Sequence, residues 1–267
     1  MKLAFSTLGC SGMPLAEVAA MAARTGWSGL ELRSAADEPI HTASPWADRA
    51  AARADLGAAV PVCVASYVRV ASGSDDGDVV AALLAEAGLA ADLGAGAVRV
   101  FAGAGGPDGS ADGAPDADEQ AARRLRAAAD TLPGDVELWL ETHDSHASGA
   151  AVARVLDRVG HPRVRAVWDI AHPWGWGEPI PVTARLLAPH LAHVQIKDQR
   201  SAADRTPVRL GTGVLPLTAM FDALGGLGYR GWLSLEWERK WHPAAEPLET
   251  VLAAGRDYLE SRLSPQR

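Results

Sequence analysis

The sequence predicts an α/β protein folded as a single (β/α)8 barrel, also called a TIM barrel. Short runs of β-branched or alternating apolar residues occur eight times, the first starting at residue 2 and the last at residue 231. Stretches rich in Ala and Leu with helical periodicity lie between them. The spacing of roughly 33 residues is the size of a βα unit with a right-handed crossover. Eight such units in strict alternation predict a closed barrel.

Each expected element follows from a local pattern of residues. The eight expected strands cover residues 2–7, 29–33, 61–68, 97–102, 136–142, 164–169, 191–197 and 231–236. Helical periodicity is clearest over residues 15–24, 79–93, 117–129 and 247–263. A doubly wound open sheet is the alternative fold, but it requires a glycine-rich phosphate turn after the first strand, and the glycines of Leu8-Gly9-Cys10-Ser11-Gly12 have a different spacing.

The domain organisation follows from length and from the absence of a linker pattern. A chain of 267 residues fits one barrel, and no shift in composition marks a second domain. We therefore expect one domain over residues 1–267. The stretch 103–117 is rich in Gly, Ala, Asp and Pro, and it is expected to be a loop at the catalytic face. This loop could be a lid over the active site or an insertion without function, and the sequence does not distinguish the two.

Composition and charge exclude several classes of protein. With 48% hydrophobic and 22% charged residues, the chain is neither disordered nor fibrous. A net charge of -8 without a basic run argues against a nucleic-acid partner. Two cysteines are too few for a disulfide framework and suit a reducing cytoplasm, and no apolar run is long enough to span a membrane. We expect a cytoplasmic protein with a small-molecule substrate, and a homo-oligomer is possible.

Polar residues gather where the last four expected strands end. In a barrel of this kind, the active site lies at the carboxyl ends of the strands. Three carboxylates there, Glu141, Asp169 and Glu236, would repel one another unless a cation balanced them, which predicts a divalent metal ion. The alternative is a buried ion network in which these acids pair with Lys197, with Arg33 or with the nearby histidines.

Four ordered motifs carry a resemblance to a known family. They are Leu140-Glu141-Thr142-His143, Trp168-Asp169-Ile170-Ala171-His172-Pro173, His193-Val194-Gln195-Ile196-Lys197-Asp198 and Gly231-Trp232-Leu233-Ser234-Leu235-Glu236-Trp237-Glu238. Together they resemble the sugar phosphate isomerase/epimerase family, the xylose isomerase-like TIM barrels. The segments 26–33 and 210–213 resemble further motifs of the same family. The resemblance covers essentially the whole chain.

The resemblance implies one divalent metal ion held by Glu141, Asp169, Gln195 and Glu236. The family usually has histidine at the third of these positions, where this chain has Gln195. A glutamine can bind a metal through its carbonyl oxygen, and a set of oxygen ligands favours Mn²⁺ or Mg²⁺ over softer ions. His193, one pleat repeat earlier on the same strand face, is the alternative ligand.

The resemblance also implies an activity and a set of substrate contacts. Glu141 and Glu236 would move a proton next to the carbonyl of a keto sugar or polyol, as in the isomerases and epimerases of the family. His172 and Lys197 would contact substrate oxygens. The other residues that we expect to bind substrate are His143, Glu31, Arg33 and Trp174.

Three other functions are weighed against this one. A lyase or dehydratase acting on a keto-inositol would use the same metal and the same proton abstraction, and the motifs do not separate it from an isomerase. An endonuclease for abasic DNA is disfavoured by the acidic net charge and by Gln195. A barrel that binds a sugar without converting it is kept open by Gln195, and metal analysis would distinguish it from the enzymes.

Overall fold

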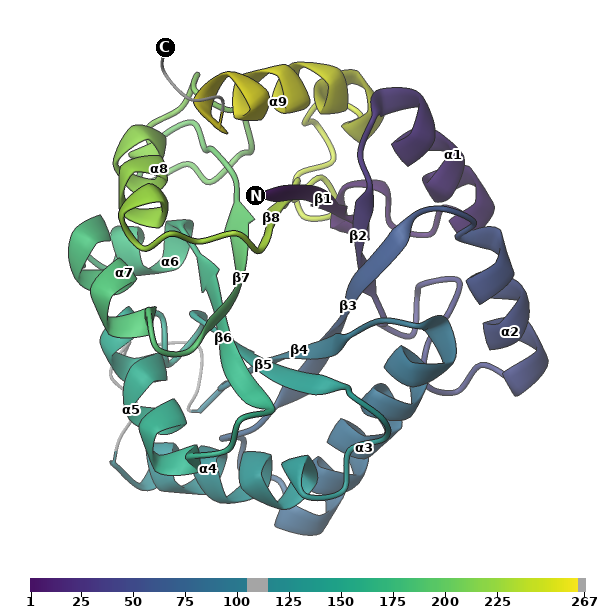
Figure 1. Cartoon of the computed structure of the whole chain (residues 1–267), viewed down its shortest axis with the longest axis vertical. Helices are drawn as coiled ribbons and strands as arrows, with labels where there is room; N and C mark the ends of the chain where they lie inside the picture. The colour runs from purple at the N-terminus through teal and green to yellow at the C-terminus, as the bar shows by residue number, and fades with distance from the viewer. Residues whose placement is uncertain (105–114, 264–267) are drawn as a thin grey trace.

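The strands close into one parallel barrel with the helices outside it (Figure 1). A computed structural model describes residues 1–104 and 115–263. Each strand pairs with its neighbours in sequence, and β8 pairs with β1 to complete the ring. The chain is therefore a single (β/α)8 barrel, as the sequence predicts. The strands are β1 (Lys2–Ser6), β2 (Gly29–Arg33), β3 (Val60–Arg69), β4 (Ala97–Phe101), β5 (Glu137–Glu141), β6 (Val164–Asp169), β7 (Leu191–Ile196) and β8 (Trp232–Leu235).

The helices follow local sequence signals. For example, the Asp75 side chain caps the start of α3 by accepting a hydrogen bond from the Gly77 amide at 2.8 Å, and Gly94 ends that helix with a φ of 77°. The four stretches with the clearest periodicity all form helices. The helices are α1 (Leu15–Thr25), α2 (Trp46–Asp55), α3 (Asp76–Leu93), α4 (Pro115–Ala129), α5 (Gly149–Val159), α6 (Ala171–Gly175), α7 (Ile180–Leu187), α8 (Leu217–Gly226) and α9 (Leu248–Leu263), with a short 3₁₀ helix η1 (Thr7–Cys10) after β1.

Small shifts in the predicted boundaries bear on the site. β7 ends at Ile196 and β8 at Leu235, so Lys197 and Glu236 are the first residues beyond their strands rather than the last residues within them. Most of the predicted loop 103–117 lies outside the described residues. Residues 115–117 belong to α4.

The strands divide the interior into two apolar regions by alternation of side chains. One region fills the space between the sheet and the helices, and it includes Val98 and Leu140. The other is small, lies inside the barrel and includes Ala97 and Trp139. On the inner face of these strands, the residues two positions further along are Arg99 and Glu141, both buried. The barrel is therefore closed by apolar side chains below and lined by charged ones above.

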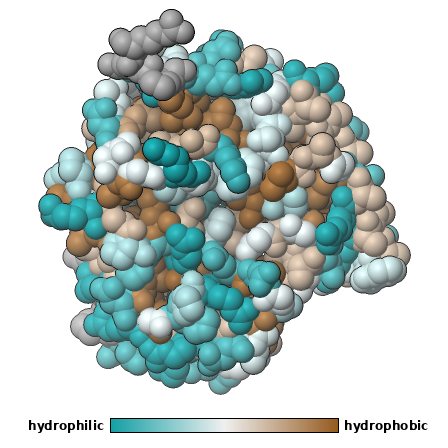
Figure 2. All heavy atoms as spheres, in the orientation of Figure 1, coloured by the Kyte–Doolittle hydropathy of each residue, from teal (hydrophilic) through white to brown (hydrophobic). Residues whose placement is uncertain are grey.

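The remaining features of the fold are its mixed surface, its helices and its two cysteines. Figure 2 shows hydrophilic and hydrophobic residues interspersed over the face that it presents. Within the described ranges, every helix is too short or too polar to cross a lipid bilayer. Cys10 and Cys63 are buried free thiols.

Candidate active site

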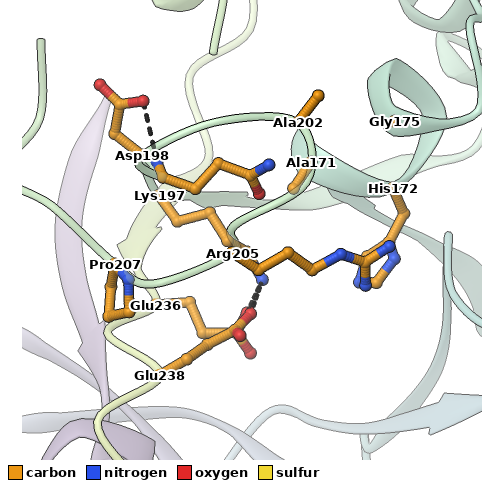
Figure 3. A pocket seen from close by; sticks show the side chains of 11 residues that line it. Ala171, His172, Gly175, Lys197, Asp198, Ala202, Arg205, Pro207, Glu236 and Glu238 are labelled. Atoms are coloured by element: carbon orange, nitrogen blue, oxygen red, sulfur yellow. Dashed lines mark hydrogen bonds and ion pairs between the residues drawn. The ribbon is translucent and has the colours of Figure 1, made fainter. Parts of the chain in front are cut away.

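A cavity of about 250 Å³ opens at the carboxyl ends of the strands. Five of the predicted site residues line it: Glu141, His143, His172, Lys197 and Glu236. A smaller pocket, drawn in Figure 3, adjoins it and shares His172, Lys197, Arg205, Glu236 and Glu238. The structure therefore brings residues from β5 to β8, distant in sequence, to one cavity.

The acids of the cavity are paired with two internal cations. The Lys197 ammonium lies 2.6 Å from Asp169 Oδ2 and also contacts Glu236 and Glu238. On the other side, Arg99 Nε lies 3.1 Å from Glu141 Oε2. All these groups except Glu238 are almost fully buried. The buried ion network that the sequence left as an alternative is thus present, with Arg99 in it and Arg33 outside it.

Burial shifts the ionisation of both predicted proton carriers. It raises the pKa of Glu141 well above 4.5 although Arg99 opposes the shift. It raises the pKa of Glu236 to about 8, against the opposing effect of Lys197. For Lys197, burial acts to lower the pKa, but Asp169, Glu236 and Glu238 outweigh it and hold the pKa well above 10.5. Lys197 is therefore charged, while the two glutamates can hold a proton near neutral pH.

Three oxygen atoms in this cluster are buried and accept no hydrogen bond. They belong to three of the four predicted ligands: Glu141 Oε2, Asp169 Oδ2 and Gln195 Oε1. Arg99 and Lys197 approach the first two as ion pairs, but outside hydrogen-bond geometry. Of the three, only Gln195 Oε1 has neither a hydrogen bond nor an ion pair, and such a buried oxygen is costly. Carboxylate and amide oxygens are the ligands that Mg²⁺ and Mn²⁺ prefer. The residues present therefore fit a divalent cation.

The ring nitrogens of two histidines lie beside Glu141. Atoms of Glu141, His143 and His172 that can bind a metal all lie within 4.8 Å of one another, and the two rings are 4.3 Å apart. His172 Nε2 is also 3.6 Å from Asp169 Oδ2. Burial, followed by His143, Lys197 and Arg205, lowers the pKa of His172 well below 6.5. His172 is therefore neutral and able to accept a hydrogen bond from a hydroxyl group.

The side chains of Gln195 and His193, both on β7, contact the carboxylate of Glu31, which comes from β2 across the barrel. Gln195 Nε2 donates to Glu31 Oε1 at 2.7 Å and to Glu236 Oε1 at 3.4 Å. His193 Nε2 bonds Glu31 Oε2 at 3.0 Å, and the His193 ring stacks on Trp139. Atoms of Glu31, Cys63 and His193 also lie within 4.8 Å of one another. Glu31 and His193 thus lie together beneath the cavity rather than in its lining.

Besides Glu31, two residues expected to bind substrate, Arg33 and Trp174, are outside the cavity lining. The Arg33 guanidinium pairs with the buried Glu38 and donates to Tyr67 Oη at 2.6 Å. Trp174 is half-buried against the hydrophobic core. A different tryptophan, Trp241, lines the cavity and is 55% exposed.

The loop after β7 is held by one aspartate. Asp198 accepts hydrogen bonds from the amides of Gln199, Gly211, Gly213 and Leu215 at 2.9 to 3.1 Å. A Cβ at Gly213 would lie 2.2 Å from Asp198 Oδ1, so no side chain fits there. This contact gives a physical reason for Gly213, and the left-handed backbone of Gly211, with a φ of 83°, gives one for the first glycine of Leu210-Gly211-Thr212-Gly213. The loop carries Arg205 to the cavity.

Sequence reasoning did not single out Arg99, Tyr67 or Arg205. Arg99 had a signal, because it is the one charged residue in the apolar run 97–102. Tyr67 lies within the long strand β3, where a tyrosine is unremarkable. Arg205 lies in a polar loop, and only its position in space connects it to the site.

Comparison with known proteins finds relatives of this barrel. The family model described as "Xylose isomerase-like TIM barrel" matches residues 19–262. A Streptomyces coelicolor protein that carries the name of a hydroxypyruvate isomerase is 33% identical over 107 residues, which are 40% of this chain and 37% of that protein. The chain thus matches well under half of this relative's length.

Solved structures show the same fold over nearly the whole chain. A D-allulose 3-epimerase from Methylomonas sp., in complex with D-allulose, has a TM-score of 0.77, 16% identity, and coverage of 98% of this chain and 97% of its own. The IolI protein, with a bound zinc atom, has a TM-score of 0.81, 16% identity, and coverage of 99% and 98%. At these identities the likeness shows the fold alone.

Proposed function

Because the chain belongs to the xylose isomerase-like TIM barrel family, we propose that it is a divalent-metal-dependent isomerase or epimerase that moves a proton next to the carbonyl of a keto sugar or polyol. The sugar isomerase and epimerase names among similar proteins support the class of reaction. The zinc bound by the similar IolI barrel supports a metal. That nucleic acid is not a partner stays a prediction from the net charge.

The observation that carries the proposal is the set of buried oxygens on Glu141, Asp169 and Gln195 that accept no hydrogen bond, the first two of which face only the side-chain cations Arg99 and Lys197. Together with Glu236, these residues would hold the ion. When bound, the ion polarises the substrate carbonyl and acidifies the adjacent C–H. Mn²⁺ or Mg²⁺ is favoured because all four side chains offer oxygen.

The proton itself would be carried by Glu141 and Glu236. They extend from β5 and β8, which are not neighbours in the ring, so they can approach a substrate from two sides. Burial favours the protonated form of each and so raises the pKa of both carboxyl groups toward neutral pH, where a general acid works best. Epimerisation would use both residues, one to remove the proton and the other to return one to the opposite face.

Two neighbours would orient the substrate. Lys197 is charged and lines the cavity, so it would donate to a substrate oxygen and stabilise negative charge that develops there. Neutral His172, also in the lining, would contact a hydroxyl group. The walls formed by Phe101 and Trp241 would limit access of water.

Solvent exchange tests the proposal. The protein, loaded with Mn²⁺ and then dialysed, should retain one ion per chain by elemental analysis. Incubated in D2O with a panel of ketoses, it should place deuterium on the carbon beside the carbonyl, as NMR would show. Glu236→Gln should abolish the exchange. Loss of water from a keto-inositol would instead identify the lyase alternative, and binding without exchange would identify a sugar-binding barrel.

A further inference from the structure

The amide of Gln195 is fixed by its contact with Glu31, which is fully buried. A primary amide carries its oxygen and its NH₂ on opposite sides of one carbon, so an NH₂ held by a carboxylate turns the oxygen away from that carboxylate. The reverse orientation would set the Gln195 oxygen against oxygens of both Glu31 and Glu236. Only one orientation of the amide is therefore compatible with its surroundings.

We propose that Glu31 is a positioning residue that presents Gln195 Oε1 to the metal ion. Glu31 is itself held by His193, whose Nε2 lies 3.0 Å from Glu31 Oε2, and the His193 ring is stacked on Trp139. Gln195 Oε1 is buried and accepts no hydrogen bond, so it is available as a ligand. Groups that orient metal ligands in this way typically change affinity 10- to 100-fold. This inference rests on the proposed function, because it needs an ion at the site.

Two conservative variants separate the hydrogen bond of Glu31 from its charge. Glu31→Asp keeps the charge but withdraws the carboxylate from the Gln195 amide. Glu31→Gln loses the charge but keeps an acceptor at the same reach. Affinity for Mn²⁺, measured by calorimetry, should fall at least tenfold in Glu31→Asp and stay within about threefold of the wild type in Glu31→Gln. An electrostatic role for Glu31 predicts the opposite order.

Cys63→Ala is the matched control. Cys63 is as buried as Glu31 and lies opposite it in the β2–β3 register, so its loss disturbs the same part of the barrel without removing the bond to Gln195. It should keep the wild-type Mn²⁺ affinity. The proposal is overturned if Glu31→Asp binds Mn²⁺ as tightly as wild type, if Glu31→Gln is the weaker variant, or if Cys63→Ala is equally impaired. A wild-type protein that binds no Mn²⁺ overturns the proposed function together with this inference.

A second feature, the arginines of the cavity, is independent of Gln195. Arg99 is 3% exposed and its Nε pairs with Glu141, but one of its Nη atoms has no hydrogen-bond partner. Arg69 Nε comes no closer than 3.9 Å to a carboxylate oxygen of Asp144. Arg205 is exposed and forms no ion pair or hydrogen bond with the residues that the structure describes. All three line the 250 Å³ cavity.

The acids near these arginines are already engaged. Glu238 is held by Lys197, and Asp144 lies 2.8 Å from His143 Nδ1. Arg69 has only the long contact with Asp144 Oδ2, and Arg205 has no partner among the described residues, so both can turn to a ligand in the cavity. From this we infer that the substrate is small and carries an anionic group, a carboxylate or a phosphate, which these arginines bind. The inference deepens the proposed function by narrowing the class of substrate.

Three-carbon probes that differ at one end test the charge requirement. Dihydroxyacetone is neutral, hydroxypyruvate has a carboxylate in place of one hydroxymethyl group, and dihydroxyacetone phosphate has a phosphate. Calorimetry with the Mn²⁺-loaded protein should show at least tenfold tighter binding of one anionic probe than of the neutral one, and the preferred probe identifies the group. Arg69→Gln and Arg205→Gln should each remove about tenfold of that preference.

Arg209→Gln is the control, because Arg209 lies on the same loop, is exposed and pairs with Glu246 away from the cavity. It should leave all three affinities unchanged. Equal affinity for all probes, or the same loss in Arg209→Gln as in Arg205→Gln, overturns the inference. Calorimetry measures binding without turnover, so it tests this inference separately from the proposed reaction. A protein that binds the anionic probes selectively but exchanges no proton with solvent would contradict only the proposed reaction.

Discussion

Two buried aspartates lie at the carboxyl ends of neighbouring strands of the barrel, and their surroundings differ. Asp198, after β7, accepts four backbone amides with its two oxygens. Asp169, at the end of β6, receives the Ala171 amide on Oδ1 at 2.7 Å, while its Oδ2 faces Lys197 without a hydrogen bond of good geometry. Both are nearly inaccessible to solvent.

The difference shows how a buried carboxylate can serve a loop or a ligand. Backbone amides that satisfy every oxygen stabilise one conformation of the chain, as at Asp198, and leave no oxygen for anything else. An oxygen opposed only by a side-chain ammonium, as at Asp169, can exchange that partner for a metal ion or a substrate. We therefore expect Asp169 to determine binding and Asp198 to determine stability.

The strongest test of this contrast is Asp169→Asn. The change removes a charge from the proposed metal site and keeps the size of the side chain. Affinity for Mn²⁺ should fall more than about 100-fold, beyond the range typical of groups that only orient a ligand. The midpoint of thermal unfolding without metal should change little. Calorimetry and circular dichroism would measure the two quantities, and wild-type affinity in this variant would contradict the ligand set.

Asp198→Ala should give the converse result. Four amides, two of them buried with Gln199 and Leu215, would lose their acceptor, so the free energy of unfolding should fall by about 3 kcal/mol. Affinity for Mn²⁺ should stay within about threefold of wild type. Urea unfolding and calorimetry would measure both. If affinity for Mn²⁺ falls well beyond threefold, the loop is part of the metal site itself.

Gln195→His should shift the metal preference by a smaller amount. The imidazole adds a nitrogen donor, so affinity for Co²⁺, Ni²⁺ or Zn²⁺ should rise about tenfold relative to Mg²⁺. Binding should also weaken more steeply from pH 7 to about pH 5, as the new imidazole takes up a proton. Titrations of both proteins at several pH values would test this. An unchanged preference and pH profile would place Gln195 outside the metal site.

The smallest expected effect is on stability against pH. The pKa of Glu236 is about 8 in the folded protein and near 4.5 in the unfolded chain, so between these values the folded state binds the extra proton. Through Glu236, stability should therefore fall as pH rises from 6.5 to 8 by up to about 1.4 kcal/mol per pH unit, and Glu141, whose pKa is also raised by burial, acts in the same direction. His172, whose folded pKa is lowered, acts in the opposite direction only below pH 6.5. Measured by urea unfolding, the free energy of unfolding should change less with pH when Mg²⁺ is saturating. If Mg²⁺ leaves this pH dependence unchanged, Glu236 does not bind the ion.

Much of the fold was accessible from the sequence, because apolar alternation and helical periodicity are local. β2 and β6 have the predicted bounds, and the others differ by one or two residues. The cavity was anticipated in part, since parallel strands bring Glu141, His143, His172, Lys197 and Glu236 to one end. Trp174 was expected to bind substrate; the structure places it in α6, partly buried against the core.

By itself the sequence determined the number and order of the βα units and the acids at the strand ends, because neighbouring residues in the chain set both. Only the tertiary structure decided which charges meet. Trp168-Asp169-Ile170 and Lys197-Asp198-Gln199 look alike as polar ends of strands. Asp198 meets backbone amides from residues 199–215, whereas Asp169 meets an ammonium from the next strand. Closure of the barrel likewise places Glu31 against Gln195, 164 positions apart in the chain. Such contacts depend on the register of strands around the ring, which no local pattern specifies.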